Sequence, residues 1–274
     1  MLRRTRTLAA VLLLSALAGC GGGSTGGSSA GTSGGTSGGS SGSASGEALR
    51  VGTEGTYAPF TFHDPKTNKL TGYDVEVTEA VGAKLGRQVQ FSESTFDAIF
   101  AGLEASRYDV VANQISVNPE RQAKYAFSKP YTVSTGVIVT RSDDTSVRSV
   151  ADIRGKKSAQ SATSNFAASA RKAGANVEAV EGFTQAVALL KQKRVDITIN
   201  DSLAVLNYLR TSGDKQIKIA AKLGDTTEQA FVFRKDSPLP AQFDKALDEL
   251  RADGTLAKIS GKWFGEDVSG PAAR

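Results

Sequence analysis

From Leu49 onward, short apolar runs typical of strands alternate with segments that carry the apolar spacing of an amphipathic helix. Residues 49–53 read as a strand, and Val77, Ala80, Val81 and Leu85 fall on one face of a following helix. Further strands are predicted at residues 61–63, 89–91, 108–112, 133–140, 177–180, 195–199 and 231–233, and further helices around residues 96–103, 183–190 and 243–250. Strands that alternate with helices favour largely parallel sheets covered on both faces, so the predicted fold class is α/β.

The first 20 residues have the layout of an export signal. Arg3, Arg4 and Arg6 precede an uncharged, mostly apolar run at residues 8–17, which is shorter than the roughly 20 residues that span a membrane. The run ends in Leu17-Ala18-Gly19-Cys20, which resembles the lipobox of bacterial lipoproteins. The resemblance implies that residues 1–19 are removed and that Cys20 is lipidated. The alternative is an ordinary signal peptide followed by a chance cysteine.

Residues 21–46 contain only Gly, Ser, Thr and Ala. Such a segment cannot bury enough apolar surface to offset the entropy of ordering it. We expect this segment to be a flexible coil with a root-mean-square end-to-end distance of about 25–30 Å. Together with lipidated Cys20, residues 20–46 would tether the folded region to the membrane. After it, about 225 residues remain, enough for one large or two small domains.

Composition excludes several classes of function. The formal net charge of +5 includes the three arginines of residues 1–19, so +2 remains afterwards, and no concentrated Lys/Arg stripe indicates nucleic-acid binding. Cys20 is the only cysteine, so lipidation would leave no thiol for a disulfide or a nucleophile. We predict no cofactor and no metal.

A series of motifs follows one order along the folded region. They are residues 51–60 (VGTEGTYAPF), 72–76 (GYDVE), 96–98 (FDA), 109–114 (DVVANQ), 118–121 with 125–131 (NPER, YAFSKPY) and 253–256 with 262–265 (DGTL, KWFG). Together they resemble the solute-binding proteins of polar amino-acid ABC importers. The resemblance runs from about residue 49 to residue 268 and covers the whole folded region.

The resemblance implies a two-lobed periplasmic-binding-protein fold of type II. Two hinge strands cross between the lobes, the ligand lies in the cleft between them, and the lobes close around it. Here the extended runs at residues 133–140 and 229–234 are the expected crossings. Lobe 1 would then comprise residues 48–135 plus 232–268, lobe 2 residues 136–231, and the tail residues 269–274.

Arg121 is the first predicted ligand residue. A guanidinium matches an amino-acid carboxylate with two parallel charge-assisted hydrogen bonds. Asn118 as N-cap and Pro119 at the first helical position would start a helix that holds Arg121 at the cleft edge. The family match adds Ser116 as a donor to the same carboxylate. For Arg121 alone, the alternative is a surface ion pair.

Two further ligand residues are predicted in lobe 2. Thr163 lies in a segment that resembles the family's turn before a helix, where a backbone N–H and a hydroxyl meet the ligand carboxylate. Asp201, just after the strand at residues 195–199, matches the family's acceptor for the ligand ammonium. A simple helix N-cap is the alternative role for each, and for Asp201 both roles can coexist.

Aromatic residues and a second acceptor complete the predicted site. Tyr57 and Phe96 match the residues that sandwich a ligand side chain in the family, although Phe96 also belongs to the apolar stripe of its helix. The motifs look most like the cystine-binding branch. Cystine carries two zwitterions, and Glu54 or Gln114 could accept from the second ammonium. Another polar amino acid, such as glutamine, arginine or lysine, is the alternative.

The same fold also serves some extracytoplasmic enzymes, such as dehydratases, and some receptor sensor domains. An enzyme needs a positioned acid or base, and with one His and no free Cys only carboxylates remain. A sensor would need a membrane-spanning helix and a signalling domain, and the chain ends at Arg274. We therefore expect a monomeric, extracytoplasmic binding protein, not an enzyme. Its partner would be the transmembrane permease of an ABC importer.

Overall fold

A computed structural model describes residues 47–270. The signal sequence of residues 1–19, lipidation of Cys20, the tether of residues 20–46 and the tail's last four residues lie outside this part of the chain. The strands are β1 (Leu49–Thr53), β2 (Thr56–Tyr57), β3 (Thr61–His63), β4 (Leu70–Thr71), β5 (Val89–Glu93), β6 (Val110–Ser116), β7 (Tyr125–Arg141), β8 (Lys157–Gln160), β9 (Asn176–Ala179), β10 (Ile197–Asp201) and β11 (Ile217–Arg234).

The helices are α1 (Tyr73–Lys84), α2 (Phe96–Glu104), α3 (Pro119–Lys124), α4 (Asn165–Lys172), α5 (Gly182–Lys191), α6 (Ser202–Ser212), α7 (Leu239–Ala252) and α8 (Thr255–Phe264), with a short 3₁₀ turn η1 (Val150–Ile153). Every predicted strand and helix is present, several with different ends. Strand β6 continues to Ser116, four residues beyond its predicted end at residue 112. The prediction ended too early because the polar side chains of Asn113 and Gln114 interrupt the apolar pattern.

Eight strands form one mixed sheet in the order β5-β1-β6-β11-β7-β10-β8-β9, and β2, β3 and β4 form a small second sheet. The outer strands pair in parallel, as expected. The pairings β6–β11, β11–β7 and β7–β10 are antiparallel. The expectation of largely parallel sheets is therefore wrong at the centre, where the chain crosses from one lobe to the other and back.

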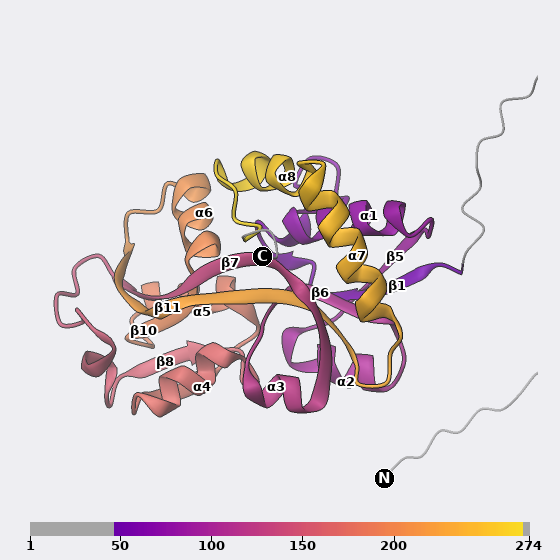
Figure 1. The fold of residues 1–274 in the computed structure, drawn as a ribbon. Helices are drawn as coiled ribbons and strands as arrows, with labels where there is room; N and C mark the ends of the chain where they lie inside the picture. The colour runs from indigo at the N-terminus through magenta and orange to yellow at the C-terminus, as the bar shows by residue number, and fades with distance from the viewer. Residues whose placement is uncertain (1–46, 271–274) are drawn as a thin grey trace, which may run out of the picture. The chain divides into compact units, whose positions relative to one another are not determined.

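The crossing strands β7 and β11 lie side by side along most of their length (Figure 1). Their pairing extends from Tyr125 with Arg234 in lobe 1 to Arg141 with Ile217 in lobe 2. Both predicted crossings lie within these strands. A continuous pair of hinge strands fixes the floor of the cleft between the lobes.

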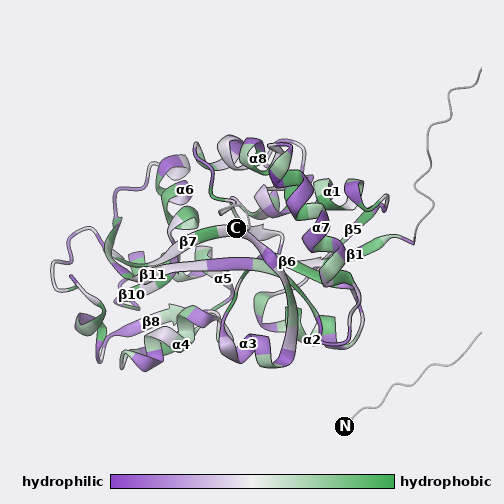
Figure 2. Cartoon of the chain, in the orientation of Figure 1, coloured by the Kyte–Doolittle hydropathy of each residue, from purple (hydrophilic) through white to green (hydrophobic). Residues whose placement is uncertain are grey.

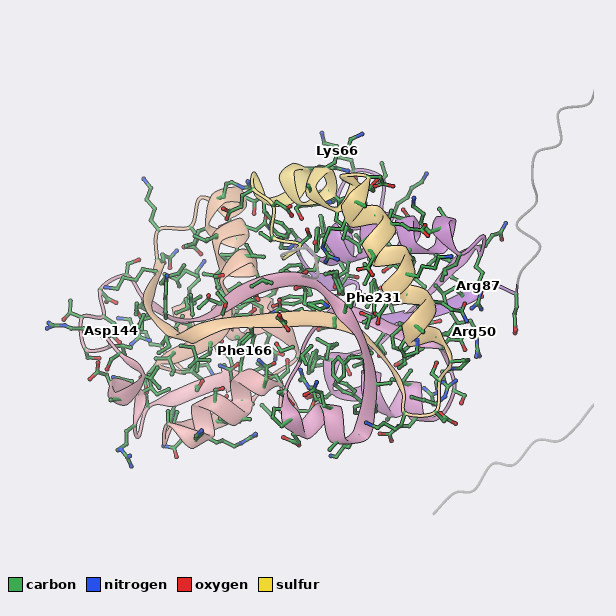
Figure 3. All side chains as sticks on the ribbon, in the orientation of Figure 1. Arg50, Lys66, Arg87, Asp144, Phe166 and Phe231 are labelled. Atoms are coloured by element: carbon green, nitrogen blue, oxygen red, sulfur yellow. The ribbon has the colours of Figure 1, made fainter. Side chains whose placement is uncertain are left out.

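Apolar clusters cover both faces of the sheet in each lobe. In lobe 1, α1, α7 and α8 pack on one face and α2 on the other. In lobe 2, α5 packs on one face and α4 on the other. Phe231 of β11, which is labelled in Figure 3, stacks on Tyr131 of β7 and meets Phe243 of α7 edge to face. These contacts tie the hinge strands to the lobe 1 core. Within residues 47–270, no helix combines the length and apolar character needed to cross a membrane.

Candidate ligand site

Arg121 is held in place by the start of helix α3. The side chain of Asn118 accepts a hydrogen bond from the backbone N–H of Arg121 at 2.8 Å, which confirms the predicted N-cap. The Arg121 guanidinium lies over the rings of Phe96 and Phe100, with Cζ 5.8 and 5.4 Å from the ring centroids. Both α2 and α3 therefore position this cation.

The Arg121 guanidinium is buried and has no carboxylate partner among the described residues. The residue is 8% exposed, Nη1 donates to the backbone oxygen of Ser116 at 3.1 Å, and Nη2 has no hydrogen-bond partner in the described part of the chain. Burial lowers the pKa of Arg121 to about 10, so it stays charged at neutral pH. A buried charge with a free donor is suited to an anion, and within residues 47–270 Arg121 does not form the surface ion pair considered for it.

Arg121 and Ser116 line one cavity together with Thr163 from lobe 2. This space, which we call the Arg121 cavity, measures about 1,490 Å³ including its open part. Residues of both lobes therefore face the guanidinium across the same gap.

Thr163 differs from its predicted role. Its backbone N–H and its hydroxyl both donate to Oδ1 of Asp97 on helix α2, at 2.9 and 2.7 Å, and the N–H of Ala162 donates to Oδ2 at 3.1 Å. Thr163 is also not the N-cap of α4, because Ser164 has that role. The donors predicted for a ligand carboxylate thus hold a carboxylate of lobe 1.

Asp201 ends strand β10 and is 3% exposed. One carboxylate oxygen accepts from the backbone N–H of Leu203 at 2.8 Å, so Asp201 is the N-cap of α6. The other oxygen accepts from the hydroxyl of Ser134 on β7. Burial raises the pKa of Asp201 to about 6, so the group is mostly ionised at neutral pH.

Tyr57 and Phe96 both line a second cavity. The Tyr57 hydroxyl donates to Oδ1 of Asn200 at 2.6 Å, so it joins lobe 1 to the end of strand β10 in lobe 2. Phe96 is half-buried, contacts Phe100 edge to face and packs against the lobe 1 core. Phe96 therefore serves the core and the cavity wall together.

Glu54 is the acidic residue of this second cavity, which we call the Glu54 cavity. Its carboxylate accepts from Nδ2 of Asn113 at 2.7 Å, and its backbone N–H donates to Oδ1 of the same side chain. Burial raises the pKa of Glu54, and the hydrogen bond from Asn113 partly offsets that rise. Its other carboxylate oxygen is available to a cationic ligand group.

Gln114 lines the Glu54 cavity in a strained backbone conformation, with φ of 49°. Its Nε2 donates to Asp74 at 2.6 Å and to Thr132 at 3.0 Å, and its backbone N–H donates to Asp74 at 2.8 Å. These bonds fix the amide, and its buried Oε1 has no partner among the described residues. Burial raises the pKa of Asp74 to about 7.

The Glu54 cavity, about 510 Å³ including its open part, shares Ser164 and Asn165 with the Arg121 cavity. A cationic residue and an acidic residue therefore stand in adjoining cavities between the lobes.

The hydrogen-bond partners of the predicted ligand residues include five described residues that the sequence did not single out: Asp97, Asn113, Asn200, Asp74 and Ser134. Asp74, Asp97 and Asn113 lie inside the motifs quoted for the family, but nothing local marks them as contacts across the cleft or within the site. Within residues 47–270, no group of three or more His, Cys, Asp or Glu side chains could hold a metal ion.

Residues 49–266 match the bacterial extracellular solute-binding proteins, family 3. The match covers the whole two-lobed region, and the chain belongs to this family. The chain is also 50% identical over 263 residues to the L-cystine-binding protein TcyA of Bacillus subtilis. The aligned region covers 96% of this chain and 97% of that relative.

Solved structures agree on the fold. The unliganded, open L-cystine solute receptor of Neisseria gonorrhoeae is 47% identical, with a TM-score of 0.56 over 82% of this chain and 95% of that one. An ancestral arginine-binding protein bound to arginine is 34% identical, with a TM-score of 0.75 over 80% of this chain and 98% of that one.

Proposed function

We propose that the protein binds L-cystine outside the cytoplasmic membrane and delivers it to the permease of an ABC importer. The observation that carries the proposal is the buried Arg121 guanidinium, whose Nη2 has no partner among the described residues. It would hold one ligand carboxylate, and Asp201 would accept from the ammonium of the same zwitterion.

The adjoining Glu54 cavity supports cystine over a smaller amino acid. Cystine has a second zwitterion, and Glu54 offers a carboxylate oxygen to its ammonium while Tyr57 and Phe96 line the space around the disulfide. Similarity to a cystine-binding relative over nearly the whole chain points the same way. Arginine is the second candidate, because Glu54 could equally accept from a guanidinium and a neighbour of known structure binds arginine.

A thermal-shift screen of the purified protein against cystine, cysteine and the standard amino acids tests the proposal. We expect saturable stabilisation by cystine, with a weaker effect of cysteine, because cysteine has one zwitterion and leaves Glu54 unpartnered. Stabilisation by arginine and not cystine would identify the second candidate. Turnover of a metabolite without stabilisation by any amino acid would favour an enzyme.

The proposed location includes a lipid anchor at Cys20. One acyl chain anchors a protein only marginally, and lipoprotein modification attaches more than one, so a modified Cys20 would hold the protein stably at the membrane. We expect Cys20→Ala to release the protein into the medium or periplasm with unchanged ligand affinity. Fractionation after a salt wash measures this. A Cys20→Ala protein that stays in the membrane fraction would contradict the anchor.

A further inference from the structure

The middle of the hinge contains polar side chains that the proposed site does not use. Ser134 of β7 and Gln229 of β11 are both buried. The central part of β11 has the colour of hydrophilic residues in Figure 2. Buried polar groups destabilise a fold unless they are hydrogen-bonded, so the partners of these two side chains need an explanation.

The two side chains form a relay that ends at Asp201. Nε2 of Gln229 donates to the Ser134 hydroxyl oxygen at 3.0 Å and to Thr227 Oγ1 at 2.9 Å. The Ser134 hydroxyl in turn donates to the Asp201 carboxylate. Each hinge strand thus supplies one member, and the third lies at the end of β10 in lobe 2.

The direction of each bond follows from the protons available. Ser134 has one hydroxyl proton, which the ionised Asp201 carboxylate accepts, so the Ser134 oxygen must accept its other bond. Only the amide nitrogen of Gln229 can donate to it, which fixes the orientation of the amide. The relay is therefore polarised toward Asp201, and hydrogen bonds in series strengthen one another.

We propose that Ser134 and Gln229 are positioning residues for the ligand ammonium: they orient the Asp201 carboxylate and keep it ionised. This inference rests on the proposed function, because it assigns the ammonium to Asp201. Since the relay joins both hinge strands to Asp201, it also makes the geometry of this acceptor depend on the hinge.

Other groups around Asp201 act on its charge. Asp74 and Tyr57 lie close enough for ionised Asp201 to raise the pKa of each. The backbone N–H groups of Leu203 and Ala204 favour the ionised carboxylate, as does the Ser134 hydroxyl. Burial opposes them, and the hydroxyl is the one favourable group that a single side-chain substitution removes.

The first test needs no ligand. Carboxyl-carbon NMR follows the titration of Asp201 in the purified protein, with Asp201→Asn to assign the resonance. We expect Ser134→Ala to raise the pKa of Asp201 by on the order of one pH unit, and Gln229→Leu to raise it less, because Ser134 remains. Ser134→Thr restores the hydroxyl and should restore the wild-type titration. Glu228→Gln, an exposed change on the same strand, should leave it unchanged.

The second test measures cystine affinity by calorimetry between pH 5.5 and 8. We expect Ser134→Ala to weaken binding about 3- to 10-fold at pH 7.5 and more below it. Its fall in affinity on acidification should begin at a higher pH than in the wild type. An unchanged Asp201 titration in Ser134→Ala, or equal weakening at every pH, would overturn the proposal. If the wild type binds no cystine, the proposed ligand is wrong, while the NMR titration still decides the roles of Ser134 and Gln229.

Discussion

The two sides of the Arg121 cavity differ in how far their polar groups are already satisfied. On the lobe 1 side, the Arg121 guanidinium is buried and retains a free donor within the described part of the chain. On the lobe 2 side, Thr163 is exposed, and both its backbone N–H and its hydroxyl are bonded to Asp97. The sequence predicts that Arg121 and Thr163 both bind the ligand carboxylate, and in the described part of the chain only the Arg121 side keeps a donor without a partner.

This difference indicates where binding energy is available. A buried charge without a partner gains much from an incoming carboxylate, because its desolvation has already been incurred on folding. An exposed turn that already holds a carboxylate gains little from exchanging it for another. We therefore expect ligand affinity to depend strongly on Arg121 and weakly on Thr163.

The largest expected effect is that of Arg121→Ala. It leaves the ligand carboxylate desolvated without its complement, which costs about 2–5 kcal/mol, or roughly 30-fold to several-thousand-fold in affinity. Titration calorimetry with cystine measures this loss. Lys124→Ala is the matched control, since it removes an exposed cation of the same helix and the same cavity. Equal losses in both variants would mean that only the general positive charge matters.

Asp201→Asn should have the next largest effect. Asparagine keeps the N-cap of α6 but loses the charge that attracts the ammonium, so we expect affinity to fall by about 1.5–3 kcal/mol at pH 7.5. The pKa of Asp201 is about 6, so wild-type affinity should decline as the pH falls through 6, and the variant should lack that part of the decline. Calorimetry at pH 5.5 and 7.5 compares the change in affinity of the wild type with that of the Asp201→Asn variant.

The same raised pKa affects the ligand-free protein in the opposite direction. Because folding raises the pKa of Asp201 from 3.8 to about 6, its contribution to stability is complete below pH 4 and is lost as the pH rises through 6. Asp201→Asn should therefore lose less thermal stability than the wild type between pH 5 and 7.5. A steeper loss in the variant would contradict the buried environment of this carboxyl.

Glu54→Gln should have a smaller effect, confined to ligands with a second cationic group. Glu54 is only half-buried, so we expect a loss of about 1–2 kcal/mol for cystine. Binding of an amino acid with a single zwitterion should be unchanged, since Glu54 does not line the Arg121 cavity, where the first zwitterion would bind. Calorimetry with cystine and cysteine compares them. An unchanged affinity for cystine would remove Glu54 from its recognition.

Local sequence predicts the lobe 1 side of the site better than the contacts between lobes. Asn118 and Pro119 start α3 and place Arg121 within three residues, so the cap and the cation could be predicted from their spacing. The partners of Thr163 and Tyr57 could not, because Asp97 and Asn200 lie 66 and 143 residues away in the chain. Such pairs depend on how the two lobes meet at the hinge.

The buried polar pair of Ser134 and Gln229 in the hinge strands could not be predicted for a similar reason. Gln229 and Ser134 are separated by 95 residues and sit in strands recognised by their apolar positions. Periodicity identifies a strand by its buried apolar side chains and assigns the polar ones to solvent. Ser134 and Gln229 are nevertheless buried, and they bond to each other.

The smallest expected effects test the Thr163 side directly. Asp97→Ala removes all three hydrogen bonds to the turn and should weaken cystine binding by about 0.5–1.5 kcal/mol, because the two lobes lose a contact. Thr163→Ala should cost less, since two backbone donors survive.

The double variant distinguishes the two roles of Thr163. If Thr163 acts through Asp97, its hydroxyl has no partner once Asp97 is removed, so the double variant should bind as Asp97→Ala does. Additive losses would mean that Thr163 contacts the ligand independently. Tighter binding by Asp97→Ala would mean that Asp97 competes with the ligand carboxylate for the turn, and the two sides of the cavity would then be alike after all.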